Sequence, residues 1–311
     1  MREDARFIPL RNRGLVENMP DLKSREVVCG QATLAGLLAG FPRLRAIVQE
    51  VEPDLMLAYN DQIGLSPLFA WGAQRLCVDI CFNEISNFPG YLQSNSVGVN
   101  SRTSIDFTKR VADINTTLQL KQVYGVSHKD YLLKWNYLKL LDALCLRRPR
   151  QTFDENSETI RLFADFVLKS TTANERILFV EQVANDTNIL CNSSINILEF
   201  ARVAERVAVE RELVWKTHPK QTVNFSVNVH RTEKSIEDAF GDVDTVVTIN
   251  STVEIEALLA DKRVITLGDS VFSKIAAGGV TDGRDILSVF LGNCVKVEYF
   301  STDPIPISDL L

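Results

Sequence analysis

Short apolar segments alternate with longer amphipathic segments along much of this 311-residue chain, and this alternation constrains the fold most. Apolar runs of four or five residues predict buried strands, and the periodic stretches between them predict helices. A chain that alternates strands with helices builds a mainly parallel sheet with helices on its faces. The sequence therefore predicts an α/β protein.

The alternation occurs in two separate regions. The first region predicts a helix at 44–51, a strand at 55–59, a helix at 65–76 and a strand at 78–82. The second predicts strands at 177–180, 213–216, 245–249 and 264–267, with helices at 195–209, 235–240 and 252–260. We therefore predict two Rossmann-like domains, the second of them doubly wound.

Helical periodicity replaces the strand pattern between these regions, at 131–146 and 160–168. This pattern predicts an intervening helical region that bridges the two domains. We place the N-terminal domain, with the bridging helices, at residues 1–165 and the C-terminal domain at residues 166–311. We found no internal repeat.

Charge and composition exclude several classes of partner and site. With 34 Lys and Arg against 40 Asp and Glu, the net charge of -6 disfavours nucleic acid as a partner. The start resembles no signal peptide, and no run reaches the ~18 apolar residues of a membrane span, so we expect a cytoplasmic protein with at most peripheral membrane association.

Several of the six cysteines lie in apolar runs, so we predict buried reduced thiols. Cys77 and Cys81 could share a metal, but no second Cys or His pair lies nearby, and we expect no metal and no cofactor.

Ligands of doubly wound sheets bind beyond the carboxyl ends of the strands, so loops that follow strands are candidate sites. Gln182 and Asp186 follow the strand at 177–180. Asp186 supplies a carboxylate, although an isolated Asp in a loop is more often a helix cap or a turn former.

A cationic corner follows the next strand, where Lys216, His218, Pro219 and Lys220 lie within five residues. Lysine supplies point charge, and histidine supplies a directional donor that changes protonation near neutral pH. This composition suits a phosphate or carboxylate ligand. An exposed basic turn is the alternative.

Asn250, Ser251 and Thr252 form a small polar turn between a predicted strand and a predicted helix. Ser251 and Glu254 have the spacing of a capping box. Free N–H groups at such a helix start can hold a nucleotide phosphate. Helix capping without a ligand is the alternative.

In the first region, Glu84 emerges where a buried strand ends, and Gly98 and Asn100 follow it. A carboxylate from one domain that faces a carboxylate from the other could form an acid/base and nucleophile pair for glycosyl transfer. Glu84 alone could equally be a surface residue.

In combination and in order, these segments resemble the capsule-polysaccharide synthesis and export family, whose members include retaining β-Kdo transferases. The Glu84 segment with Gly98-Val99-Asn100 looks like the family's first-domain signature, and Gln182 to Asp186 looks like its Gln-x-x-x-Asp motif. His218-Pro219 looks like its His-Pro motif. Ser251-Thr252 with Glu256-Ala257-Leu258 looks like its last donor-site helix. The resemblance covers residues 59–268, and the joint order of the motifs carries it.

The resemblance implies a GT-B fold with the active site between the two domains and a CMP-sugar donor, such as CMP-Kdo. Asp186 would be the nucleophile that forms a covalent sugar adduct, and Glu84 the acid/base on the acceptor hydroxyl. The implied donor-binding residues are Gln182, Lys216, His218, Pro219, Asn250, Ser251 and Thr252. Gly98 and Asn100 would lie on the acceptor side. The implied substrates are a nucleotide sugar and a saccharide acceptor, a growing surface polysaccharide or glycolipid.

Two other functions are compatible with the same residues. A GT-B transferase with a UDP-sugar or CDP-polyol donor would also use a His-Pro loop and a phosphate-binding helix start. A non-catalytic sugar- or nucleotide-binding module would bind ligand without turnover. Comparison of CMP with UDP, and of wild type with Asp186→Ala, would separate these functions.

Overall fold

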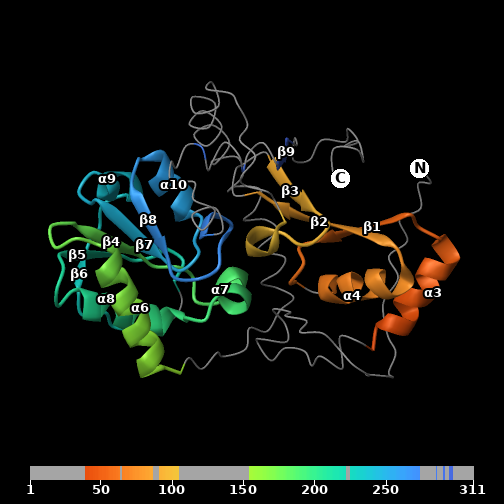
Figure 1. Cartoon of the computed structure of the whole chain (residues 1–311), viewed down its shortest axis with the longest axis horizontal. Coiled ribbons are helices and arrows are strands. Elements are labelled where there is room, and N and C mark those ends of the chain that lie inside the picture. Colours follow the sequence, from red (N-terminus) through yellow and green to blue (C-terminus); the bar gives the residue numbers. More distant parts are fainter. Residues whose placement is uncertain are drawn as a thin grey trace.

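The computed structural model describes residues 39–63, 65–86, 91–104, 154–221 and 225–273, together with residues 285, 290 and 294–296. These residues form two β-sheets with associated helices (Figure 1). The elements of the first sheet region are α3 (Phe41–Val51), β1 (Leu55–Tyr59), α4 (Ser66–Leu76), β2 (Asp79–Ile85), β3 (Tyr91–Asn95), the 3-10 helix η1 (Asn100–Arg102) and β9 (Cys294–Lys296). The elements of the second are α6 (Ser157–Ser170), β4 (Ile177–Val180), α7 (Thr187–Asn192), α8 (Ile197–Val207), β5 (Leu213–Lys216), β6 (His230–Arg231), α9 (Ile236–Phe240), β7 (Thr245–Thr248), α10 (Val253–Leu259) and β8 (Arg263–Thr266).

The first sheet has the strand order β1-β2-β3-β9 and is mixed. The β1–β2 pair is parallel, as predicted, but β3 runs antiparallel to both β2 and β9. The predicted parallel pairing in this region therefore holds for β1 and β2 but does not extend to β3 and β9. Only residues 86–90 separate β2 from β3, and a parallel crossover needs a dozen or more residues.

Helices α3 and α4 pack against each other beside the first sheet (Figure 1). Leu44 and Val48, one helical turn apart on α3, contact Leu68 and Trp71 of α4. A Cβ atom on Gly72 would lie 2.4 Å from Leu44 Cδ2. The absence of a side chain at Gly72 therefore permits the close approach of the two helices.

The second sheet is parallel throughout, with the strand order β6-β5-β4-β7-β8. Ile177 and Phe179 of β4 join the core beneath α6 and α8. Leu178 and Val180 join a separate core that includes residues of α9 and α10. Both faces of the sheet are covered, so the predicted doubly wound sheet is confirmed for this region.

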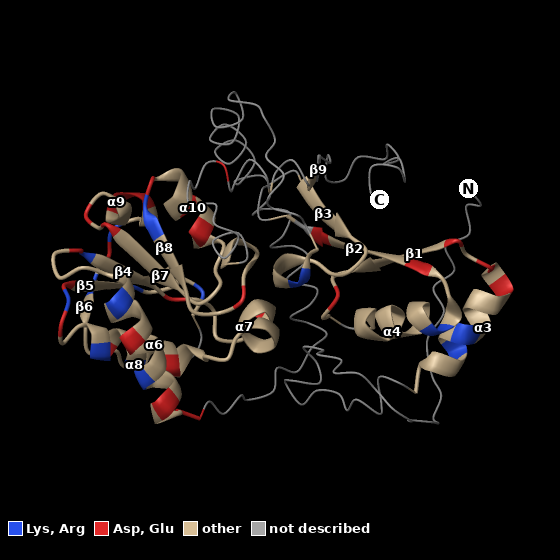
Figure 2. Cartoon of the chain, in the orientation of Figure 1, with Lys and Arg blue, Asp and Glu red and all other residues tan. Residues whose placement is uncertain are grey.

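Polar residues mark the starts of α6 and α8. Asn196 and Glu199 form a complete capping box at α8, and Asn156 caps α6 by accepting hydrogen bonds from two backbone N–H groups. Glu199 also accepts a hydrogen bond of 2.9 Å from the backbone N–H of Asn156. One carboxylate thus fixes the starts of both helices. Charged residues of both signs lie on these two helices, whereas β4 and β7 carry none (Figure 2).

The apolar side of α6 packs against the second sheet through Ala164 and Val167, both fully buried. The predicted domain boundary between residues 165 and 166 falls inside this helix, which therefore belongs with the second sheet. The predicted helix at 131–146 lies outside the described residues. Among the residues that are described, no helix is both long and apolar enough to cross a membrane.

Of the described cysteines, Cys81 and Cys191 are buried reduced thiols, as predicted. Cys77 is exposed, contrary to the prediction, because it is the left-handed C-cap residue of α4 with φ 55°. No three His, Cys, Asp or Glu side chains within the described ranges gather closely enough to hold a metal ion.

Candidate functional site

The two central strands of the second sheet, β4 and β7, are parallel neighbours, and their exit loops meet. The connections from β4 lead to one side of the sheet and those from β7 lead to the other, which makes this edge the topological switch point. Gln182 Nε2 donates to Asn250 Oδ1 at 3.0 Å, and Asn250 N donates to Gln182 Oε1 at 3.3 Å. Two of the predicted donor-side residues are therefore brought together, both of them buried.

Asp186 is the N-cap of α7, a six-residue helix that the sequence did not predict. Its Oδ1 accepts a hydrogen bond of 2.8 Å from the backbone N–H of Asn188. Asn250 Nδ2 in turn donates to the carbonyl of Asn188 at 2.9 Å. The helix-cap alternative for Asp186 is thus realised, and the same contacts fix its carboxylate close to the Asn250 loop.

The His-Pro loop is held by Glu181, a buried residue that the sequence did not single out. Glu181 accepts hydrogen bonds of 3.0 Å from the backbone N–H of His218 and from Gln221 Nε2. Burial raises the pKa of Glu181, and these hydrogen bonds lower it only in part. The carboxyl group therefore links the exit of β4 to the loop that follows β5.

Within that loop, the imidazole of His218 has a defined tautomer. Its Nδ1 accepts a hydrogen bond of 3.0 Å from the backbone N–H of Lys220. In the neutral ring the proton then resides on Nε2, which becomes the donor. Pro219 and Lys220 are exposed, whereas Lys216 at the end of β5 is half-buried.

The predicted capping box at Ser251 and Glu254 is wrong. Thr252 is the N-cap of α10, in a helical conformation and without a side-chain cap, and Ser251 Oγ accepts a hydrogen bond of 3.3 Å from the backbone N–H of Val253. Glu254 is 1% exposed, and its carboxyl oxygens form no well-aligned hydrogen bond with the described residues. Burial raises the pKa of Glu254 to about 8, although the nearby Ser270 hydroxyl lowers it slightly. The side chain points into the protein rather than back to the helix start.

In the first sheet, Glu84 lies one residue before the end of β2 and is held by two donors. Tyr59 Oη donates to Glu84 Oε1 at 2.8 Å, and Asn60 Nδ2 donates to Glu84 Oε2. Asn60 is buried and has a left-handed φ of 55°, a conformation that Asn tolerates better than most residues. The exit of β1 therefore positions the candidate acid/base residue.

One residue, Gln93, lies between Glu84 and Asn100, a predicted acceptor-side residue. Gln93 is directly opposite Glu84 across the β2–β3 ladder. The backbone N–H of Asn100 donates to Gln93 Oε1 at 2.9 Å, and Gln93 Nε2 donates to Asn100 Oδ1 at 3.3 Å. The structure thus brings Glu84 and Asn100 to the same end of the sheet.

Gly98, the other predicted acceptor-side residue, makes room for an ion pair between buried Asp61 and exposed Arg102. Asp61 Oδ2 lies 3.2 Å from Arg102 Nη1, and Asp61 Oδ1 accepts a hydrogen bond of 3.4 Å from the backbone N–H of Val99. A Cβ atom on Gly98 would lie 2.8 Å from Arg102 Cβ and 3.0 Å from Asp61 Oδ2. Gly98 therefore permits this ion pair to form.

A pair of buried amides joins the two halves of the candidate site. Gln62 follows β1, and Asn192 is the last residue of α7, which lies beside the first sheet (Figure 1). Gln62 Nε2 donates to Asn192 Oδ1 at 2.8 Å, and Asn192 Nδ2 donates to Gln62 Oε1 at 2.9 Å. We call this contact the amide joint.

Sequence reasoning missed the consecutive residues Asn60, Asp61 and Gln62, all of which are buried. One signal could have revealed them, because three polar residues in succession follow an apolar strand at its carboxyl end. Asn192 carried no such signal, since it lies in a short helix with no clear periodicity.

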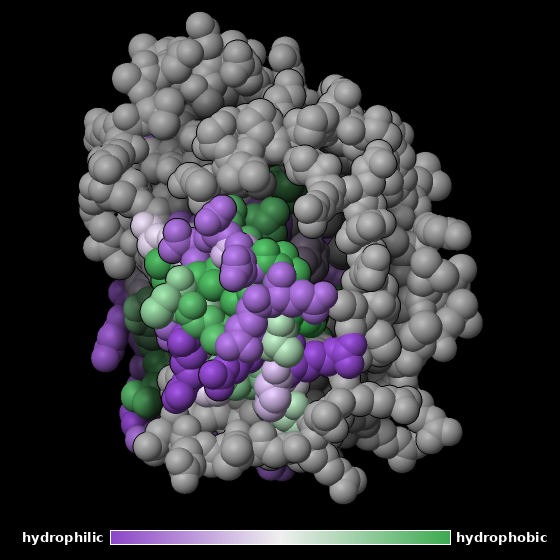
Figure 3. Space-filling view, turned by 90° about the vertical axis from the view of Figure 1, so that its right-hand side faces the viewer, coloured by the Kyte–Doolittle hydropathy of each residue, from purple (hydrophilic) through white to green (hydrophobic). Residues whose placement is uncertain are grey.

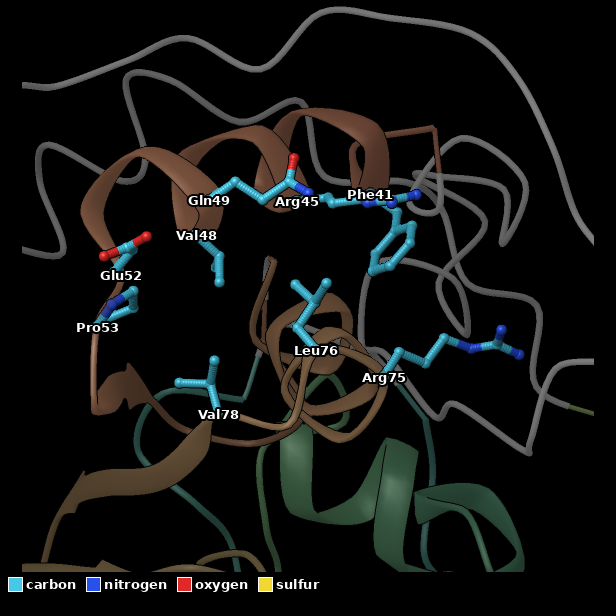
Figure 4. Close-up of a pocket in the computed structure, with 9 residues that line it drawn as sticks. All are labelled: Phe41, Arg45, Val48, Gln49, Glu52, Pro53, Arg75, Leu76 and Val78. Carbon is cyan, nitrogen blue, oxygen red and sulfur yellow. The ribbon is translucent and has the colours of Figure 1, made fainter.

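A surface pocket of about 670 Å³ lies elsewhere, between α3 and α4 (Figure 4). Val48, Leu76 and Val78 point into it, whereas the guanidinium of Arg75 points away. On this side of the molecule, hydrophobic surface is bordered by hydrophilic residues (Figure 3). The pocket includes Val78, which precedes β2, and so lies at the end of the strands opposite to Glu84. It is separate from the candidate site.

Several known proteins resemble this one. Protein FixF of Sinorhizobium fredii (strain NBRC 101917 / NGR234) is 38% identical over 96 residues, which are 30% of this chain and 23% of FixF. The match thus spans about a quarter of the length of that curated relative. Among solved structures, the beta Kdo 2,7 transferase of Thermosulfurimonas dismutans KpsC is 15% identical over 85% of each chain, with a TM-score of 0.42. The beta Kdo 2,4 transferase of the same KpsC is 14% identical over 68% of each chain, with a TM-score of 0.38.

A family model supplies the more extensive sequence match. The model described as "Capsule polysaccharide biosynthesis protein" matches residues 127–291, which are more than half of the chain. The matched range contains the β4, β5 and β7 exit loops with Asp186, His218 and Ser251. The chain therefore belongs to the capsule polysaccharide biosynthesis protein family.

Proposed function

We propose that this protein is a glycosyltransferase with a GT-B arrangement, which moves a sugar from a CMP-linked donor onto a growing surface polysaccharide or glycolipid. The donor that we favour is CMP-Kdo. The observation that carries the proposal is the polar cluster at the switch point, where Gln182, Asn250 and the Asp186 cap meet in a member of a capsule-polysaccharide family. Polar loops at this edge are where doubly wound sheets bind nucleotides and sugars.

In the first step of the proposed reaction, the Asp186 carboxylate attacks the anomeric carbon of the donor sugar. The bond from that carbon to the phosphate oxygen of CMP breaks, and CMP leaves with the electron pair. His218 donates through Nε2–H to the phosphate or the sugar carboxylate, and Lys216 adds positive charge. Ser251 and Thr252 supply hydroxyl groups to the same ligand. Preorganised donors of this kind stabilise charge that develops on a leaving group.

In the second step, an acceptor hydroxyl attacks the sugar carbon and the bond to Asp186 breaks. Glu84 removes the hydroxyl proton. The hydrogen bonds from Tyr59 and Asn60 hold the Glu84 carboxylate in place, as a general base requires. Two displacements at one carbon restore the original configuration, so the reaction is retaining.

Trapping the adduct tests the nucleophile. Incubation of the Glu84→Gln variant with CMP-Kdo alone is expected to release one CMP per protein and to add one sugar mass to the peptide that contains Asp186, as measured by mass spectrometry. Asp186→Asn should give neither product while keeping its fold. Asp79→Asn, at an exposed Asp of β2, is the matched control and should behave as wild type. Release of CMP without an adduct would reject the double displacement.

Nucleotide protection tests the donor class and the alternatives. CMP should raise Tm while UDP does not, because a ligand that binds the folded state stabilises it by about 2.7 kcal/mol at a concentration of 100 Kd. A larger shift with UDP would favour a UDP-sugar donor. Protection by CMP without transfer from CMP-Kdo to any saccharide would favour a different CMP- or CDP-linked donor or a non-catalytic binding module.

A further inference from the structure

The amide joint is placed to control the geometry of the candidate site. Gln62 is 2% exposed and Asn192 is 7% exposed, although the two residues are 130 positions apart in the chain. Each side-chain amide donates once and accepts once within the pair. A reciprocal pair of this kind fixes both the separation and the relative orientation of its two backbones.

On the side of the first sheet, hydrogen bonds connect Gln62 of the joint to Glu84 through Asn60. The backbone N–H of Gln62 donates to Asn60 Oδ1 at 2.7 Å, and Asn60 Nδ2 donates to the Glu84 carboxylate. Asn60 also donates through its backbone N–H to the carbonyl of Asn83 in β2 at 2.8 Å. A shift of Gln62 would therefore move a donor to Glu84.

On the side of the second sheet, Asn192 of the joint is the last residue of α7, the helix that Asp186 caps. Asn192 Nδ2 lies 3.5 Å from Asn188 Oδ1, and the backbone N–H of Asn188 donates to the Asp186 carboxylate. The carbonyl of Asn192 accepts a hydrogen bond of 2.8 Å from the backbone N–H of Asp269. Both ends of α7 are therefore fixed to neighbouring loops.

We propose that Gln62 and Asn192 are positioning residues, which hold the Glu84 carboxylate and the Asp186 carboxylate at the separation that sugar transfer requires. This inference rests on the glycosyltransferase function proposed above. Both amides are uncharged and do not titrate, so they exchange no proton with substrate. Their effect on the reaction is exerted through the two carboxylates. Misplacement of a catalytic group by about 1 Å is enough to slow an enzyme strongly.

The test combines truncation with an exchange of the two residues. Gln62→Asn removes one methylene group from the joint, and Asn192→Gln adds one, so the double variant restores the total length. We expect each single variant to lower kcat for CMP release from CMP-Kdo by about tenfold, because each breaks hydrogen bonds between buried groups. The KM for donor should change by less than about threefold, since donor contacts are retained. The double variant should recover most of the lost kcat.

Gln74→Asn, at an exposed glutamine of α4, is the matched control for Gln62→Asn and should retain wild-type kcat. A purely structural role predicts a lower Tm with unchanged kcat in the folded protein at low temperature, and that result would overturn the inference. A double variant no faster than its slower parent would also overturn it.

Hydrogen exchange separates failure of the inference from failure of the proposed function. Gln62→Ala should speed amide exchange at residues 59–63 and also at 187–192, because the joint connects the two segments. Faster exchange at 59–63 alone would show that the joint does not couple them and would overturn the inference. If wild type releases no CMP from CMP-Kdo, the proposed function is rejected. The catalytic part of the inference is then rejected as well, whatever the result of the exchange experiment.

Discussion

Two buried glutamates of the second sheet region differ in how the fold accommodates them. Glu181 accepts hydrogen bonds from His218 and Gln221, so it has local partners for its charge. Glu254 is 1% exposed and forms no well-aligned hydrogen bond with the described residues, although the Ser270 hydroxyl lies nearby. Burial that outweighs such weak hydrogen bonding favours the neutral form of a carboxyl group.

The raised pKa of Glu254 predicts that stability decreases with increasing pH. In the folded protein the pKa is about 8, against an ordinary value of 4.5, so the folded state binds the proton more tightly than the unfolded state. The stability that the protonated Glu254 carboxyl group contributes is fully present below pH 4.5 and is lost as pH rises toward 8.

Glu254→Gln removes this titration while it keeps the side-chain shape. We expect the variant to unfold at higher urea than wild type at pH 8, and at nearly the same urea at pH 5. Glu233→Gln, at an exposed glutamate, is the control and should follow wild type at both pH values. A Glu254→Gln variant less stable than wild type at pH 8 would contradict the prediction.

At the scale of elements, the sequence predicted β1, β4 and β5 with the bounds that the structure has. These strands are short apolar runs bounded by polar residues, so local pattern determines them. β3, with the sequence Tyr-Leu-Gln-Ser-Asn, was missed because its last three residues are polar and its second neighbour, β9, lies about two hundred positions away. Local sequence carries no record of such a partner.

The candidate site shows the same division between local and distant determinants. Strand-exit position was enough to select Gln182, Asn250 and Glu84, and the structure brings each of them together with other polar groups. The contact of Gln62 with Asn192 was not predictable, because it depends on how two distant segments pack. The wrong capping box at Glu254 has a related cause, since burial of that side chain overrides its local spacing.

The turn before η1 yields a prediction about steric fit. Gly98→Ala would place a Cβ atom 2.8 Å from Arg102 Cβ, closer than real Cβ atoms approach. We expect a loss of about 1–3 kcal/mol in the free energy of unfolding, because overpacking must displace η1 or break the Asp61–Arg102 ion pair. Urea denaturation would measure this loss. Gly241→Ala is the matched control, since its added Cβ atom would meet only the Asp238 carbonyl at 3.3 Å, and its loss should be smaller.

At the scale of the whole molecule, the amide joint connects the two sheet regions. A ligand that binds one region should therefore also slow local opening in the other. We expect saturating CMP to slow amide exchange at 181–192 directly and at 59–63 through the joint, by about tenfold in the more protected segment, because binding suppresses local opening. Hydrogen exchange with mass spectrometry would measure both segments. In Gln62→Ala, the protection should persist at 181–192 and disappear at 59–63, and equal protection in both segments would contradict this coupling.

The residues proposed to bind donor follow strands of the second sheet or end them, outside its apolar interior. The two cores beneath and above the sheet are made by other side chains, among them Phe179, Phe200 and Trp215. Substitutions at exposed positions of the exit loops, such as Pro219 and Lys220, therefore leave these cores intact. Under the function proposed above, a few point mutations in these loops would be enough to change which donor sugar is accepted, because the framework that supports the loops would not have to change.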